Sequence, residues 1–138
     1  MTLVLHGRKV VPGVVEGEAL VSHETISGWG GIDPERGVIT ERRHELAGQC
    51  FTGKILVFPG AKGSSGWSGF FQASRLAGTA PLGMIFTAMT TKVALGAVVT
   101  RVPAVLVPTE QHPLDVISTG DWVRIDAASG VVEIKKSD

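Results

Sequence analysis

The residues best suited to chemistry in this chain lie in one glycine-rich stretch, FPGAKGSSGWSG, at positions 58–69. Two consecutive serines, Ser64 and Ser65, follow Lys62 and Gly63, and the residues after them have the apolar spacing of a helix. The free N–H groups and the positive dipole end of a helix N-terminus bind anions, and glycines let the backbone approach a ligand closely. The stretch therefore predicts a site for a carboxylate or a phosphate, with Lys62 as an added cation.

Two known phosphate-binding motifs do not describe this stretch. The P-loop carries glycine-lysine-serine after a four-residue spacer, whereas Gly63 separates Lys62 from Ser64 here, and the dinucleotide fingerprint is absent. A plainer alternative is that Ser64 or Ser65 is only a helix N-cap, which contributes about 1 kcal/mol. Hydrolase chemistry at Ser64 is weakly supported, because the GxSxG motif is absent and the four histidines have no motif spacing to this serine.

A second glycine-rich stretch, SGWGGIDPERG, occupies positions 27–37. Gly30 and Gly31 give the backbone freedom beside the bulky Trp29, which predicts a loop shaped against another surface. The alternative is a turn in which Asp33 forms an Asx cap. We expect this loop to lie with the serine stretch at one cleft.

Two charged segments lie outside the glycine-rich stretches. In GAVVTRVPAV, at positions 96–105, Arg101 stands in an apolar run, where it either forms a fork for a carboxylate or snorkels at a strand end. The run TERRHE, at positions 40–45, is typical of a solvated helix start. The sequence shows no extra basic cluster for a phosphate group.

The elements that must position these residues alternate along the chain. Apolar runs predict strands at 3–5, 9–11, 17–22, 54–58, 82–87 and 104–107, helices at 65–77 and 91–98, one or two helical turns at 112–118, and a hairpin at 122–127 and 131–135. Strand–helix alternation predicts parallel pairing. We expect residues 1–138 to form a single α/β domain, in which a β layer from both termini packs on a parallel βαβ core. The connector from His23 to Gly53 has too many turn residues for regular structure.

Composition excludes several classes of protein. Thirteen basic residues balance thirteen acidic ones, which leaves no electrostatic footprint for a nucleic acid or an anionic membrane. No window approaches the roughly 20 apolar residues of a membrane span, and no secretory pattern is present, so a cytoplasmic location is expected. The single cysteine, Cys50, cannot form an internal disulfide or build a zinc or iron–sulfur site by itself, so we expect no metal site in this chain.

Three segments together resemble the swivel domain, or small subunit, of the aconitase X family, in the order and spacing of that family: residues 17–39, 43–65 and 78–107. The resemblance implies a swivelling β/β/α domain of three layers that docks onto a large subunit to form a dehydratase. It implies that Ser64 is the catalytic acid/base of the small subunit. It also implies that iron or an iron–sulfur cluster is held by cysteines of the large subunit, with no cofactor in this chain.

The same resemblance implies a small carboxylated hydroxy compound as substrate. The family's two substrates are cis-3-hydroxy-L-proline, which gives 1-pyrroline-2-carboxylate, and mevalonate 5-phosphate, which gives trans-anhydromevalonate 5-phosphate. The segments SSGWSG (64–69) and MTTKVALG (89–96) depart from the archaeal pattern, so the sequence favours the hydroxyproline dehydratase over phosphomevalonate dehydratase. The residues expected to bind substrate beside Ser64 are Lys62, Gly63, Ser65, Gly30, Gly31 and Arg101.

Two other classes remain open. A phosphohistidine swivelling domain has an ending similar to GDWVRIDAASGVVEI, but its chemistry needs a histidine where Ser64 and Ser65 stand. A non-catalytic binding domain would use Trp29 and Trp67 as interface anchors.

Overall fold

The main sheet has eight strands in the order β1-β12-β11-β3-β7-β9-β10-β2, in a computed structural model that describes residues 2–63 and 66–137. The strands are β1 (Thr2–His6), β2 (Arg8–Val11), β3 (Val14–Val21), β7 (Ile55–Phe58), β9 (Gly83–Phe86), β10 (Ala104–Leu106), β11 (Trp122–Asp126) and β12 (Val131–Lys135). The strands at the two ends of this order, β1 and β2, are consecutive in the chain and separated only by Gly7. The sheet therefore curls round on itself into two halves.

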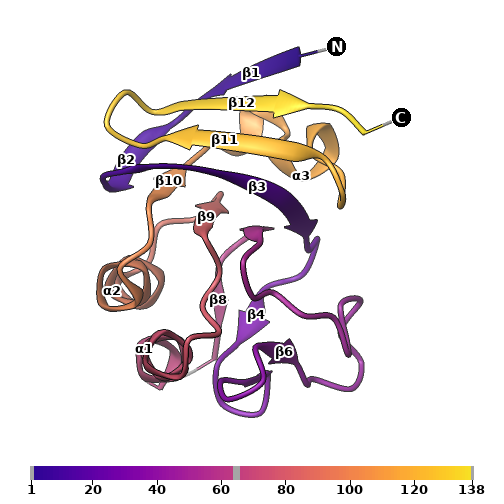
Figure 1. Ribbon diagram of the computed structural model, residues 1–138, viewed down its shortest axis with the longest axis vertical. Coiled ribbons are helices and arrows are strands. Elements are labelled where there is room, and N and C mark those ends of the chain that lie inside the picture. Colours follow the sequence, from indigo (N-terminus) through magenta and orange to yellow (C-terminus); the bar gives the residue numbers. More distant parts are fainter. Residues whose placement is uncertain (1, 64–65, 138) are drawn as a thin grey trace.

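The half built from the chain ends is antiparallel and forms the layer at the top of Figure 1. In it, β12 pairs with β1 and β11, and β11 pairs with the first part of β3. Along the hairpin, partly exposed side chains alternate with four fully buried ones: Val123, Ile125, Val132 and Ile134. The hairpin predicted at 122–127 and 131–135, with one solvated face, is confirmed.

The other half of the sheet holds the parallel core. β7 pairs in parallel with the last part of β3 and with β9, and β9 pairs in parallel with β10. Every residue of β7, β9 and β10 is buried, as expected for strands covered on both faces. β3 begins at Val14 rather than at the predicted Gly17, because its first residues pair with β11.

Two helices, α1 (Trp67–Ala77) and α2 (Thr91–Thr100), cover the face of the parallel strands that is turned away from the antiparallel layer (Figure 1). α1 stops at Gly78 in the left-handed conformation, as predicted. Its N-cap is Gly66, without a side-chain hydrogen bond, so the cap position does not belong to either predicted serine. α2 runs two residues past the predicted end. The layers are therefore β, β and α, which confirms the predicted fold class.

Short elements complete the chain. Between β10 and β11 lie a 3-10 turn, η1 (Thr109–Gln111), and α3 (Pro113–Val116). α3 is the helical turn predicted within 112–118, whereas η1 lies before that range. None of the helices in the described part of the chain combines the length and the apolar character needed to cross a membrane.

The space between the parallel strands and the helices is filled by aromatic side chains. Trp67 is only 1% exposed and lies with its ring centroid 4.3 Å from that of Phe71 and 6.1 Å from that of Phe58. Its indole Nε1 donates a hydrogen bond to the Ile26 carbonyl at 2.8 Å. The interpretation of Trp67 as an interface anchor is therefore wrong, because the ring belongs to the core.

The packing of Trp67 on α2 gives a testable prediction for Gly96. A Cβ added at Gly96 would lie 2.0 Å from Cζ3 of the buried Trp67 ring. We expect Gly96→Ala to lower the free energy of unfolding by about 1–3 kcal/mol despite alanine's better helix propensity. The control is Gly69→Ala in α1, where an added Cβ meets nothing within 4 Å and a gain of about 0.5–1 kcal/mol is expected. Urea unfolding measures both; a stabilising Gly96→Ala would contradict the packing.

The connector, residues 23–53, contains more regular structure than expected. It forms three two-residue strands, β4 (Ile26–Ser27), β5 (Ile32–Asp33) and β6 (Val38–Ile39), of which β5 and β6 pair with each other. Its buried apolar side chains join the core around the helices: Ile26, Ile32, Ile39, Leu46 and Phe51. The prediction of an irregular connector is wrong here, because these scattered apolar residues fix the turns against the core.

Candidate functional site

The two glycine-rich loops lie side by side at the carboxyl ends of β3 and β7. β4 pairs in parallel with β8 (Ala61–Lys62), so that Ser27 stands opposite Lys62, and the Ile26 N–H donates to the Gly60 carbonyl at 3.1 Å. In open α/β sheets, ligands bind beyond the carboxyl ends of the strands. The predicted meeting of the two stretches is confirmed, and it occurs where this rule expects a site.

Close backbone approach explains two glycines of the first loop. A Cβ on Gly31 would lie 2.0 Å from the Ser27 carbonyl oxygen, and one on Gly28 would lie 2.9 Å from the Trp67 Cα. The turn is closed by a hydrogen bond from the Gly31 N–H to the Gly28 carbonyl at 3.2 Å. The loop is therefore held tightly between α1 and the β5–β6 hairpin.

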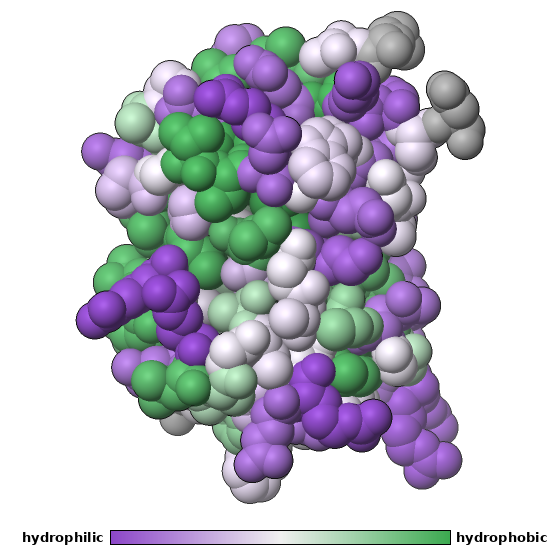
Figure 2. All heavy atoms as spheres, in the orientation of Figure 1, coloured by the Kyte–Doolittle hydropathy of each residue, from purple (hydrophilic) through white to green (hydrophobic). Residues whose placement is uncertain are grey.

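A hollow of about 510 Å³ opens beside the two loops. Its lining brings together Glu24, Gly30, Thr40, Glu41, Arg42, Arg43 and Lys62. The two arginines belong to the run TERRHE, which forms turns rather than the predicted helix start. Figure 2 shows hydrophilic residues gathered along the lower edge of the molecule, where Figure 1 places the connector. The statement that no extra basic cluster exists is therefore wrong, because the fold adds two guanidinium groups to Lys62.

The charge of Lys62 is fixed by a neighbouring carboxylate. Its Nζ donates to Oε1 of Glu41 at 2.8 Å, and this hydrogen bond, with the Coulombic attraction of the same carboxylate, raises the pKa of Lys62 above its ordinary value. Lys62 is therefore an ammonium group at neutral pH, and part of its charge is balanced by Glu41. The next residue, Gly63, has φ of 90°, and its carbonyl accepts a hydrogen bond from Nζ of Lys92.

The predicted serines lie outside the described residues. The expectation that Ser64 is the acid/base and that Ser65 binds substrate thus stays a prediction. The segments that flank them are fixed, however, by the β4–β8 pairing before them and by Trp67 after them.

Arg101 does not meet the other predicted site residues. It forms the left-handed C-cap of α2, while Lys92, in the first turn of the same helix, reaches Gly63. α2 spans ten residues. The carbonyl of Pro103, which follows it, accepts a hydrogen bond from the N–H of Met84 near the start of β9. Arg101 therefore lies near the amino ends of the parallel strands, whereas the glycine-rich loops lie at their carboxyl ends. The structure does not support its predicted role in substrate binding.

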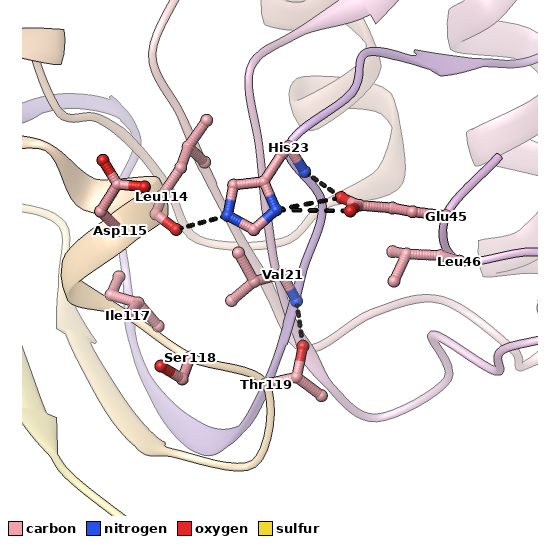
Figure 3. Close-up of a pocket in the computed structure, with 9 residues that line it drawn as sticks. All are labelled: Val21, His23, Glu45, Leu46, Leu114, Asp115, Ile117, Ser118 and Thr119. Atoms are coloured by element: carbon pink, nitrogen blue, oxygen red, sulfur yellow. Dashed lines mark hydrogen bonds and ion pairs between the residues drawn. The ribbon is translucent and has the colours of Figure 1, made fainter.

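Two histidines of the connector have structural partners. In Figure 3, His23 lies in a separate hollow of about 420 Å³, with Nδ1 3.2 Å from the Glu45 carboxylate and Nε2 2.9 Å from the Leu114 carbonyl. Burial raises the pKa of Glu45, but hydrogen bonds from the backbone and ring of His23 outweigh it and leave that pKa below its ordinary value. Both ring nitrogens of His23 are thus engaged, and it joins the connector to α3.

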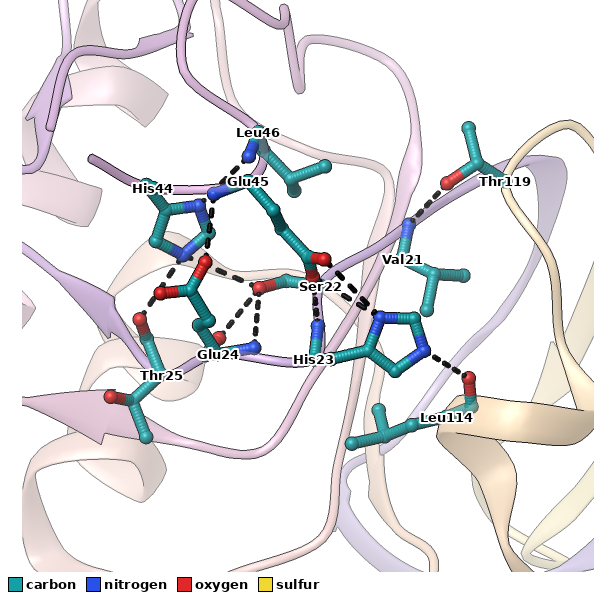
Figure 4. Close-up of polar contacts among 10 residues, drawn as sticks. All are labelled: Val21, Ser22, His23, Glu24, Thr25, His44, Glu45, Leu46, Leu114 and Thr119. Carbon is teal, nitrogen blue, oxygen red and sulfur yellow. Dashed lines mark hydrogen bonds and ion pairs between the residues drawn. The ribbon is translucent and has the colours of Figure 1, made fainter. Parts of the chain in front are cut away.

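His44 is buried beside the same segment (Figure 4). Its Nδ1 accepts the Leu46 N–H at 3.0 Å, and its Nε2 lies 3.2 Å from the Thr25 carbonyl and 3.3 Å from Ser22 Oγ. Ser22 is completely buried and donates to a backbone carbonyl, so it is not a nucleophile. These contacts give the hydrolase alternative no support.

The chain's own residues do not fit an iron–sulfur cluster. Cys50 is its single cysteine; it is exposed on the connector and does not line the hollow. Within residues 2–63 and 66–137, no three His, Cys, Asp or Glu side chains gather in a way that could hold a metal ion. No chemical step is therefore assigned to a metal bound by this chain.

The fold and the site define a small three-layer α/β domain with a hollow lined by three cationic side chains, two carboxylates, a threonine and a glycine. The family model described as the aconitase X swivel domain matches residues 4–134. The chain belongs to this family, which confirms the resemblance carried by the sequence.

Known relatives match almost the whole chain. The phosphomevalonate dehydratase small subunit of Thermococcus kodakarensis is 42% identical over 130 residues, covering 94% of this chain and 95% of that protein. The protein of the same name in Methanosarcina acetivorans is 36% identical, covering 96% and 91%. A crystal structure of Thermococcus kodakaraensis aconitase X, in its holo-form, superposes with a TM-score of 0.89 at 41% identity, covering 97% of this chain and 99% of that one.

Proposed function

We propose that this chain is the small subunit of a dehydratase that converts mevalonate 5-phosphate to trans-anhydromevalonate 5-phosphate. The observation that carries the proposal is the hollow beside the glycine-rich loops, which Arg42, Arg43 and Lys62 line together. Guanidinium groups match the geometry of phosphate oxygens, and an ammonium adds a further donor. The names of the relatives support the same substrate, and they favour it over hydroxyproline, which the sequence alone favoured.

The proposed reaction needs a group that moves a proton from the carbon beside the substrate carboxylate, while hydroxide leaves from the next carbon. We assign this proton transfer to Ser64. Lys62, which stays charged, favours the alkoxide form of a neighbouring serine and holds an anionic group of the substrate. The backbone at Gly63, Ser65, Gly30 and Gly31 completes the proposed contacts with substrate. Iron or an iron–sulfur cluster belongs, in this proposal, to the large subunit.

The test is turnover by the complex of this chain with its large subunit, prepared without oxygen. The rate of formation of each unsaturated product is measured with mevalonate 5-phosphate and with cis-3-hydroxy-L-proline. We expect kcat/KM to be at least about 100-fold higher for the phosphorylated substrate, the value of two charge-assisted hydrogen bonds. Turnover of hydroxyproline without turnover of mevalonate 5-phosphate would overturn the proposal.

The two arginines give a second measurement. We expect Arg42→Ala and Arg43→Ala each to raise KM for mevalonate 5-phosphate about 10- to 100-fold, because each removes a charged hydrogen bond to phosphate. The matched control is Arg75→Ala, an exposed arginine in the last turn of α1 that does not line the hollow. If KM for both variants stays within twofold of wild type, the arginines do not bind the phosphate.

One feature of the hollow favours a second candidate substrate. Glu24 and Glu41 line it together with the cations, and a carboxylate is the natural partner of the ring ammonium of cis-3-hydroxy-L-proline. Hydroxyproline dehydration is therefore the second candidate. It predicts that Glu24→Gln raises KM for hydroxyproline, whereas loss of this carboxylate leaves KM for a phosphate ester unchanged or lower.

A further inference from the structure

Trp29 is an exposed aromatic residue on an otherwise tightly held loop. Its side chain is 78% exposed, and the edge-to-face contact with Phe70 of α1 places their ring centroids 5.7 Å apart with an interplanar angle of 75°. Phe70 itself is half-buried. Tryptophan is enriched among the residues that contribute most of the binding energy of protein interfaces, so an exposed tryptophan on a rigid loop is a candidate anchor.

The backbone around Trp29 is fixed on both sides. Ser27 Oγ donates to the Trp29 carbonyl at 2.9 Å, and the Thr40 N–H donates to the Gly31 carbonyl at 2.8 Å. Gly28 packs so closely on the Trp67 Cα that no side chain fits there. A ring presented in this way loses little conformational entropy when it is covered.

The position of Trp29 indicates what covers it. It directly precedes Gly30, which lines the hollow with Lys62. In the proposed function, groups from a large subunit complete the reaction at this hollow, so that subunit must approach the rim on which the ring stands. We propose that Trp29 and Phe70 form a docking surface for an apolar pocket of the large dehydratase subunit. The inference rests on the proposed function for the existence of that partner.

The test measures affinity rather than activity. The purified large subunit is titrated calorimetrically with wild-type chain, with Trp29→Ala and with Trp29→Phe. We expect Trp29→Ala to weaken binding about 30-fold or more, and Trp29→Phe to retain most of the affinity. At saturating small subunit, kcat of the Trp29→Ala complex is expected to stay within twofold of wild type.

A second exposed tryptophan provides the matched control. Trp122 is 47% exposed on the antiparallel layer, where its Nε1 donates to Glu16 at 2.7 Å. Trp122→Ala is expected to leave the affinity unchanged. Equal affinities for wild type and Trp29→Ala, equal losses for the two alanine variants, or self-association of the chain that Trp29→Ala abolishes would each overturn the docking surface.

The proposed function and the docking surface fail in different ways. A complex that turns over neither substrate, but loses affinity through Trp29→Ala, refutes the reaction and supports the surface. A wild-type chain that does not bind the large subunit at all overturns the surface.

Discussion

Alanine at Ser64 is expected to lower kcat of the two-subunit complex about 10²- to 10⁴-fold, the range for loss of a positioned proton-transfer group. The physical reason lies in the segments that flank it. Lys62 before it remains protonated through Glu41, and Trp67 after it fixes the start of α1 by its bond to Ile26. In the proposed function, the charged Lys62 favours the alkoxide form of this serine. The measurement is single-substrate kinetics with mevalonate 5-phosphate.

The controls for Ser64→Ala separate chemistry from binding and folding. Ser68→Ala, in the first turn of α1, is expected to keep wild-type kcat. Ser65→Ala is expected to act mainly on KM, because its proposed role is contact with substrate. The affinity for the large subunit is expected to be the same for all three variants. If Ser64→Ala retains near-wild-type kcat, Ser64 is not the acid/base.

The parts of the fold that the sequence predicted well are those set by local pattern. The apolar runs of β7, β9 and β10 are continuous, and all their residues are buried. The alternation in the last two strands gave the hairpin with one solvated face. Gly78 ended α1 because the left-handed C-cap needs no side chain there. In each case the pattern of neighbouring residues was enough to predict the element.

The connector was harder to predict because its structure depends on distant residues. β4 has two residues and exists through its pairing with β8, some 35 residues further on. The run TERRHE has the composition of a helix start. However, His44 is buried, and its ring forms hydrogen bonds with the backbone of Thr25 and Leu46, which hold the segment in turns. The two arginines reach the hollow only as a result of that fold. No local pattern carries this information.

Arg101 shows a different kind of error. The sequence already predicted a helix between two parallel strands. Such a helix runs antiparallel to the strands, from their carboxyl ends back to their amino ends. Residues at the two ends of the helix therefore lie at opposite ends of the strands, as Lys92 and Arg101 do. The interpretation of Arg101 as a ligand group considered its chemistry and its apolar neighbours, but not this consequence of topology.

Asparagine at Asp121 is expected to lower the free energy of unfolding by about 2–4 kcal/mol. The side chain is only 1% exposed, and Oδ2 lies 2.5 Å from the Lys136 Nζ and accepts the Ser118 N–H at 2.8 Å. Oδ1 accepts the Ser137 N–H at 2.9 Å. An amide cannot accept all of these donors, and it leaves the Lys136 ammonium without its counter-charge. Denaturant unfolding at pH 7 measures the loss, with exposed Asp115→Asn as a control expected to change stability by less than about 0.5 kcal/mol.

The pH dependence of this effect has a definite sign. Burial raises the pKa of Asp121, but the hydrogen bonds from Lys136, Ser137 and Ser118 outweigh it and lower the pKa from 3.8 to about 2. Because the folded-state pKa lies below the unfolded one, the ionised carboxylate contributes about 2 kcal/mol above pH 4, and this contribution is lost as the pH falls through 2. The stability difference between wild type and Asp121→Asn should therefore shrink between pH 5 and pH 2. A difference that is constant over this range would mean that the loss comes from packing rather than from charge.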